Sequence, residues 1–112
     1  MPKPAQRSYS RYAIDAIELL GQLIRIGRIE RKLTTQDLAT RAGISRDLLH
    51  RIERGEPGCS IGAVFETAAI VGVPLFEAER SSLAGRINDT GSKLALLPKA
   101  VRRKTRTVRD DF

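Results

Sequence analysis

The chain is poor in the residues that disulfides, metal centres and membrane spans require. Its 112 residues include one cysteine, Cys59, and one histidine, His50, and only 4% are aromatic. One cysteine excludes an internal disulfide framework and fits a reducing compartment. One cysteine and one histidine are also too few for a protein-only zinc site, so no metal is expected. No apolar run approaches the ~20 residues that span a bilayer, and no apolar stretch follows the charged first residues, so neither a membrane span nor a signal peptide is expected.

Positive charge, in contrast, is abundant and unevenly distributed. Lysine and arginine number 20 against 13 acidic residues, which gives a net charge of +7 at pH 7. Residues 93–112 hold seven bases and two acids, so +5 of this charge lies in the last twenty residues. A basic chain of this size indicates a polyanionic partner, and DNA, RNA and acidic membranes all qualify.

The apolar pattern predicts helices whose core is aliphatic rather than aromatic. A first helix is expected from about residue 12 to residue 31, because apolar residues recur there at three- and four-residue steps: Ile14, Ile17, Leu20, Leu23 and Ile24. Gly21 and Gly27 weaken this helix slightly and allow close contact with another helix. A fourth helix is expected after its cap, Ser60, with an inner face of Ile61, Val64, Phe65, Ala68 and Val71.

One folded unit flanked by looser segments is expected. The C-terminal stretch has too few large apolar residues to form its own core. Asn88, Asp89, Gly91 and Ser92 predict a linker. The expected organisation is a flexible N-terminal arm over 1–9, a helical domain over 10–83, and a linker with a flexible basic C-terminal tail over 84–112.

Residues 35–54 predict two short helices joined by a tight turn. Thr34 and Asp37 have nearly the spacing of a capping box, Gly43 suits a left-handed turn residue, and Ser45 is placed to cap the second helix. The angle between the helices would be fixed by the apolar residues Leu38, Ala39, Ala42, Ile44, Leu49 and Ile52. This is the helix-turn-helix pattern, in which the second helix lies in the major groove of DNA. The candidates for reading base edges are the outward polar residues Ser45, Arg46, Asp47, His50 and Arg51.

The chemistry of these side chains supports base readout. Arg46 lies near the start of the second helix, where it can reach O6 and N7 of guanine, and a phosphate contact or a solvated side chain are the alternatives. His50 is expected to point outward, because its apolar neighbours already supply the buried face. Arg51 is expected to contact either a base or a phosphate. Asp47 is expected either to accept from cytosine N4 or to orient a neighbouring arginine.

Phosphate contacts are expected at two helix starts. Thr35 and Gln36 begin the first helix of the pair, where free N–H groups and the helix dipole favour an anion. Ser60 offers the same at the fourth helix, and Arg41 adds a charge. Capping is the simpler role for Thr35 and Ser60, and the two roles can coexist.

Residues 28–76 resemble the Xre-type repressor domain, a five-helix fold related to phage repressors. The matching segments are residues 33–39, 42–45, 52–55 and 72–73, which read LTTQDLA, AGIS, IERG and GV. The resemblance implies an all-α, five-helix repressor-like helix-turn-helix domain in a cytoplasmic, nucleoid-associated bacterial protein. It also implies an ion pair between Arg28 and Glu53 that fixes the second helix of the motif to the scaffold. Where the family more often has Thr-Gln, this chain has a second threonine, which divides the phosphate contact between Thr35 and Gln36.

A single such domain reads only a few base pairs, so a homodimer on palindromic double-stranded DNA is expected. The dimer contact is expected near Val71, Val73, Leu75 and Phe76. No catalytic pair, phosphate loop or metal cluster is present in the sequence, so neither an enzyme nor a cofactor is expected.

A narrower resemblance, to HipB-like antitoxins, is carried by residues 58–62 and 96–102. It implies a HipA-like serine/threonine kinase toxin as a partner, held inactive by the tail residues Lys99, Arg102, Arg103 and Phe112. The alternative is a stand-alone regulator whose tail is an electrostatic arm along DNA. A solvated tail without a role is the third interpretation.

Overall fold

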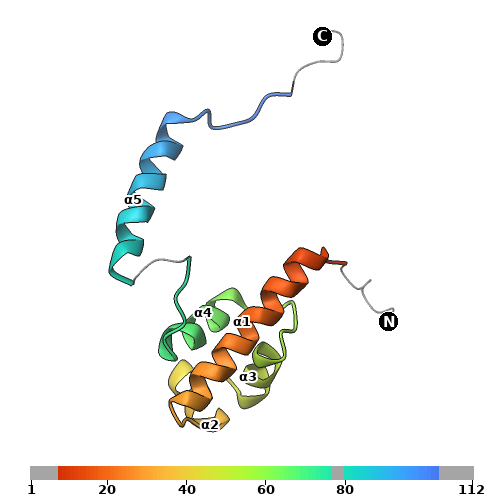
Figure 1. Ribbon diagram of the computed structural model, residues 1–112. Coiled ribbons are helices and arrows are strands. Elements are labelled where there is room, and N and C mark those ends of the chain that lie inside the picture. The colour runs from red at the N-terminus through yellow and green to blue at the C-terminus, as the bar shows by residue number, and fades with distance from the viewer. Residues whose placement is uncertain (1–7, 77–79, 104–112) are drawn as a thin grey trace. The chain divides into compact units, whose positions relative to one another are not determined.

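The structure, a computed structural model, describes residues 8–76 and 80–103. Its helices are α1 (Arg11–Glu30), α2 (Thr35–Ala42), α3 (Arg46–Glu53), α4 (Ile61–Ile70) and α5 (Arg80–Leu96) (Figure 1). The expected all-α fold with five helices is confirmed, and no extended strand is found in the described ranges. Most of the expected N-terminal arm and the last nine residues, Phe112 among them, lie outside these ranges.

The chain divides into two compact units, Met1–Ala78 and Glu79–Phe112. The first contains α1 to α4, and the second contains α5. The linker expected at residues 88–92 is wrong, because these residues lie within α5. Asn, Asp, Gly and Ser are weak helix formers, which led to the linker interpretation. The apolar residues Leu83, Ile87 and Leu94 recur at helical spacing on either side of them.

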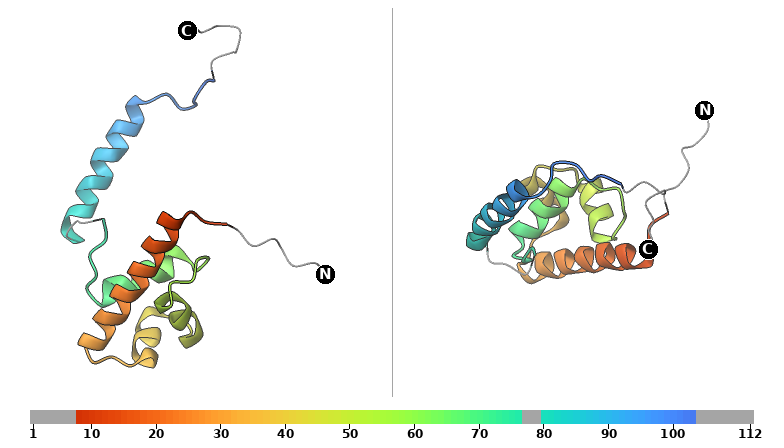
Figure 2. Two further views of the ribbon diagram at one scale, coloured as in Figure 1. Left: turned by 45° about the vertical axis from the view of Figure 1, so that its right-hand side comes forward. Right: turned by 90° about the horizontal axis from the view of Figure 1, so that it is seen from above.

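The core of the first unit lies between α1 and the three short helices, which pack beside it (Figure 2). α1 contacts α3 and α4, and α2 contacts the same two helices. The buried apolar side chains are Ile24, Leu38, Ala39, Leu49, Ile52, Ala68 and Val71. This aliphatic cluster holds α2 and α3 in a fixed arrangement, and burial of each large side chain contributes ~1.5–3 kcal/mol.

Two glycines allow α1 to approach its neighbours closely. A Cβ atom at Gly21 would lie 2.5 Å from the carbonyl oxygen of Ile52, at the end of α3. A Cβ atom at Gly27 would lie 2.9 Å from the carbonyl oxygen of Val71, just after α4. Both contacts are with backbone atoms, so alanine fits at neither position without movement of a helix end.

Two residues assigned to inner faces lie outside the core. Leu23 is 41% exposed and Ile61 is 69% exposed. On α1, the buried positions are Gly21, Ile24 and Gly27, so the helix is turned away from the side on which Leu23 lies. Periodicity places apolar residues on a helix but does not say which part of a broad apolar face is covered.

The helix starts follow the expected capping chemistry at α2 and α3 but not at α4. The Thr34 hydroxyl accepts from Asp37 N–H at 3.0 Å, and the Asp37 carboxylate accepts from Thr34 N–H at 2.9 Å, which completes a capping box. The N–H group of Thr34, together with its hydroxyl, holds the pKa of Asp37 below its usual value of 3.8. At α4, the side chain of Ser60 makes no capping hydrogen bond, so that expectation is wrong.

Candidate nucleic-acid interface

The helix-turn-helix is formed by α2, a turn at residues 43–45, and α3. Gly43 adopts a left-handed conformation with φ of 70°. Glycine can do so without steric cost because it has no Cβ atom. Ile44 N–H donates to Ala39 C=O at 3.0 Å and closes the turn. The Ser45 hydroxyl then accepts from Leu48 N–H at 3.0 Å and starts α3. The turn is therefore set by local backbone chemistry.

The polar residues of α3 other than Glu53 share one side of the helix. Leu49 and Ile52 are buried on the other side. The expected base-reading residues Ser45, Arg46, Asp47 and His50 are exposed, and Arg51 is half-buried. α3 thus presents a polar surface to solvent while its apolar side anchors it.

Arg51 is drawn toward the loop after α3 rather than toward Asp47. Its Nε lies 3.3 Å from Glu56 Oε1, and Glu56 also accepts from Arg54 at 2.7 Å. Arg54 and then Arg51 hold the pKa of Glu56 below its usual value. Within the described ranges Asp47 forms no ion pair, so the structure does not bring it together with Arg46 or Arg51.

Three of the residues expected to bind phosphate lie at the starts of α2 and α4, and the fourth, Arg41, lies in the last turn of α2. Thr35 is half-buried beside the capping box, and Gln36 Nε2 donates to Thr40 Oγ1 at 3.1 Å. Arg41 and Ser60 are exposed. Because Ser60 does not cap α4, its hydroxyl has no role in that helix end that would compete with a phosphate.

A polar hollow of about 270 Å³ lies beside the start of α2 and the exposed side of α3, and further arginine side chains line it. It is lined by Arg25, Arg28, Thr35, His50, Glu53 and Arg54. Sequence reasoning missed Arg25 and Arg54 as contributors. Arg25 lies three residues before Arg28, on the same face of α1, and this spacing is the signal that could have identified it. The hollow joins the start of α2 to the exposed side of α3 through a basic surface.

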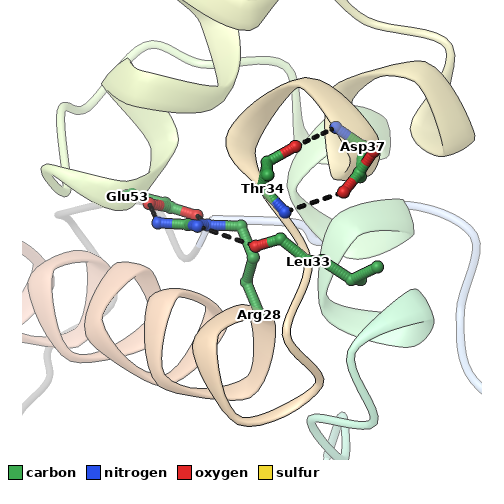
Figure 3. Close-up of polar contacts among 5 residues, drawn as sticks. All are labelled: Arg28, Leu33, Thr34, Asp37 and Glu53. Atoms are coloured by element: carbon green, nitrogen blue, oxygen red, sulfur yellow. Dashed lines mark hydrogen bonds and ion pairs between the residues drawn. The ribbon is translucent and has the colours of Figure 1, made fainter.

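The ion pair between Arg28 and Glu53 connects α1 to the end of α3 (Figure 3). Arg28 Nε and Nη2 donate to the two carboxylate oxygens of Glu53 at 2.7 and 3.1 Å. Arg28 Nη1 donates to Leu33 C=O at 3.0 Å, in the turn before α2. The side chains are only 12% and 7% exposed. One guanidinium group therefore links three segments, and the position of α3 on the scaffold depends on it.

A short helix, a glycine turn and a second helix with an exposed polar side define a helix-turn-helix DNA-binding domain. In agreement, residues 19–83 match the model of a family described as helix-turn-helix domain. The match covers more than half of the chain, and the chain belongs to this family. No curated protein and no solved structure gives a significant match. Domains of this kind are typical of DNA-binding regulators. None of the helices described has the length and apolar character needed to cross a membrane.

Proposed function

We propose that this protein is a sequence-specific transcriptional repressor that binds a palindromic operator as a homodimer. The observation that carries the proposal is the division of α3 into a buried apolar side and an exposed polar side, held on the scaffold by the Arg28–Glu53 pair. Two copies are needed because one recognition helix contacts only a few base pairs, and the two half-sites would lie about one helical turn apart.

Within this proposal, the exposed residues of α3 read bases and the surrounding ones position the domain. Arg46 is assigned to a guanine, since it lies in the first turn of α3. Ser45, Asp47 and His50 complete the reading surface. Thr35, Gln36, Arg41 and Ser60 contact phosphates, and Arg25 of the polar hollow joins them. Arg51, already engaged by Glu56, is assigned to a phosphate near the edge of the surface.

Arg46→Ala tests the base-reading assignment. Loss of a bidentate contact with guanine should cost ~1–3 kcal/mol at one operator position and leave the preference at other positions unchanged. Binding-site enrichment from a random DNA library, followed by anisotropy titration, measures both effects. Arg41→Ala is the contrasting variant, because loss of a phosphate contact should weaken binding to all sequences equally and reduce the salt dependence. Unchanged selection at every position with Arg46→Ala would reject Arg46 as a reader.

The tail supports a more specific proposal, an antitoxin that inhibits a HipA-like serine/threonine kinase and represses its own operon. Lys99, Arg102 and Arg103 are exposed in the described part of the tail. The tail also contains two acids, Asp110 and Asp111, and an aromatic residue, Phe112. The acids oppose binding along a phosphate backbone, whereas an aromatic side chain can anchor in a protein pocket. The competing function is a stand-alone regulator whose tail is an electrostatic DNA arm.

Removal of residues 99–112 separates these functions, because it leaves α5 intact. If the tail binds a kinase, the truncated protein should keep its operator affinity and salt dependence but fail to retain a HipA-like kinase in a pull-down from its native host. If the tail is a DNA arm, affinity should fall for all sequences, and the slope of log affinity against log salt should decrease by about 0.9 for each lost phosphate contact. The second result would overturn the antitoxin proposal and leave the repressor proposal intact.

A further inference from the structure

Helix α5 presents apolar side chains that its own unit cannot bury. In the second unit, α5 is the one helix among the described residues. Ile87 is 70% exposed, Leu94 is 68% exposed, and Leu97, which follows the helix, is 49% exposed. The N–H group of Leu97 donates to Leu94 C=O at 3.1 Å, so the last turn extends to Leu97.

The composition of α5 does not favour a helix that stands alone. Its 17 residues include Gly85 and Gly91, each of which costs ~1 kcal/mol relative to alanine in a helix. Asn88, Asp89 and Thr90 are also weak helix formers. An isolated helix of this length is marginal in water even with strong helix formers. Packing of its apolar side against a partner would therefore stabilise this helix.

The apolar residues have the spacing of a two-stranded coiled coil. Leu83, Ile87, Thr90, Leu94 and Leu97 follow one another at steps of four, three, four and three residues, a repeat of 3.5. Thr90 fits the row because its hydroxyl donates to the carbonyl oxygens of Arg86 and Ile87 at 2.9 and 3.0 Å. With its donor satisfied inside the helix, Thr90 can present its methyl group to a partner. Each position of the row thus has an apolar group to offer a partner.

The charges beside this row favour a second copy in parallel orientation. Two basic residues, Arg86 and Lys93, follow one edge of the row, and two small residues, Ala84 and Gly91, follow the other. In an antiparallel pair the basic edges face each other, which sets Arg86 opposite Lys93 and is unfavourable. In a parallel pair each basic edge faces the small edge of the other helix, without like-charge contact.

We propose that α5 pairs in parallel with α5 of a second copy of this chain and so forms the dimer contact. The contact expected from the sequence near Val71 is wrong for that residue, because Val71 is 2% exposed and belongs to the core of the first unit. The pairing would supply the two-fold symmetry that the proposed operator requires, but it does not depend on DNA. A dimer that does not bind DNA would refute only the repressor proposal, and an operator-binding dimer held together by another contact would refute only the pairing of α5.

Substitution of glutamate into the row measures the contact in the full-length protein. Leu94→Glu should raise the dimer dissociation constant by about tenfold or more, since it would place a charge where the paired helices bury a leucine. The matched control is Leu96→Glu on the same turn, because Leu96 is 86% exposed and lies outside the row. Leu19→Glu, on the exposed side of α1, tests whether that helix is the dimer surface instead. Sedimentation equilibrium without DNA gives the dissociation constants. Equal effects of Leu94→Glu and Leu96→Glu, a monomeric parent protein, or dissociation only with Leu19→Glu would each overturn the proposal.

Disulfide trapping tests the orientation, in a Cys59→Ser background. In the parallel pair, Leu83→Cys and Leu94→Cys should each form disulfide-linked dimers with their own kind, and Leu96→Cys should not. In that pair positions 83 and 94 lie about 16 Å apart along the helix axis, so a mixture of the two variants should form no mixed dimer. A mixed dimer as the main product would establish the antiparallel pair and overturn the assigned orientation. Thermal melting of each variant confirms that the first unit remains folded.

Discussion

Replacing Glu53 with alanine should lower the free energy of unfolding by ~3–5 kcal/mol, the usual cost of removing one partner from a buried ion pair. The Arg28 guanidinium would keep only the hydrogen bond to Leu33 C=O and would remain in a site where it is 12% exposed. Total stability of a domain is only ~5–15 kcal/mol, so this single change removes a large fraction of it. Urea denaturation followed by circular dichroism measures the loss.

Two further variants show whether the stability loss in Glu53→Ala comes from leaving the Arg28 charge buried without a partner or only from the loss of an ion pair. Asp15→Ala breaks the ion pair with Arg11, whose side chains are 80% and 61% exposed, and should cost less than about 1 kcal/mol. The double variant Arg28→Met with Glu53→Leu removes both charges and should recover most of the stability. If Glu53→Ala and Asp15→Ala have equal effects, the pair between α1 and α3 is not the link described above.

Gly21→Ala should also destabilise the protein strongly, although alanine is the better helix former. Helix propensity alone predicts a gain of ~1 kcal/mol. Overpacking costs ~1–3 kcal/mol and more where neighbours cannot move. Here the new Cβ atom would meet Ile52 O at 2.5 Å, Glu53 O at 3.0 Å and Gly55 N at 3.1 Å, all backbone atoms at the end of α3. The steric term should therefore win, with a net loss of roughly 2 kcal/mol.

Gly62 provides the matched control, because it also lies within a helix of the first unit. The nearest atom to a Cβ at Gly62 is Ser60 Oγ, at 3.8 Å, an ordinary contact. Gly62→Ala should raise stability by ~0.5–1 kcal/mol through helix propensity alone. Thermal unfolding of the two variants decides the point, and a stabilised Gly21→Ala protein would show that α1 can move away from α3 without cost.

The helix-turn-helix was predictable because its determinants are local. The αL conformation at Gly43, the caps at Thr34 and Ser45, and the buried Leu38 and Leu49 all follow from short spacings in the sequence. The start and extent of α5 were not predictable in this way, since weak helix formers occupy its middle. Nor was the polar hollow around Arg25, because it forms only when α1 and α3 are packed together.

The Arg28–Glu53 pair was predicted only through the family resemblance. The structure shows in addition that the pair is largely buried and that Arg28 also donates to Leu33 C=O. Both partners lie at helix ends that are far apart in sequence, so no local pattern distinguishes Glu53 from the exposed Glu18 or Glu30. The exposure of Leu23 was likewise not predictable from local sequence. A broad apolar face on α1 leaves several rotations open, and the close approach at Gly21 and Gly27 selects one.

In α3, the residues that anchor the helix to the scaffold are different from the residues that are exposed for DNA recognition. Leu49, Ile52 and Glu53 face the scaffold, whereas Arg46, Asp47 and His50 face solvent and contribute nothing to the core. Mutations at the solvent-facing positions should therefore accumulate during evolution at little cost in stability. A gene duplicate could drift to a new set of target promoters within a few substitutions while the parent scaffold stayed unchanged, and an engineer could retarget it by randomising the same three codons.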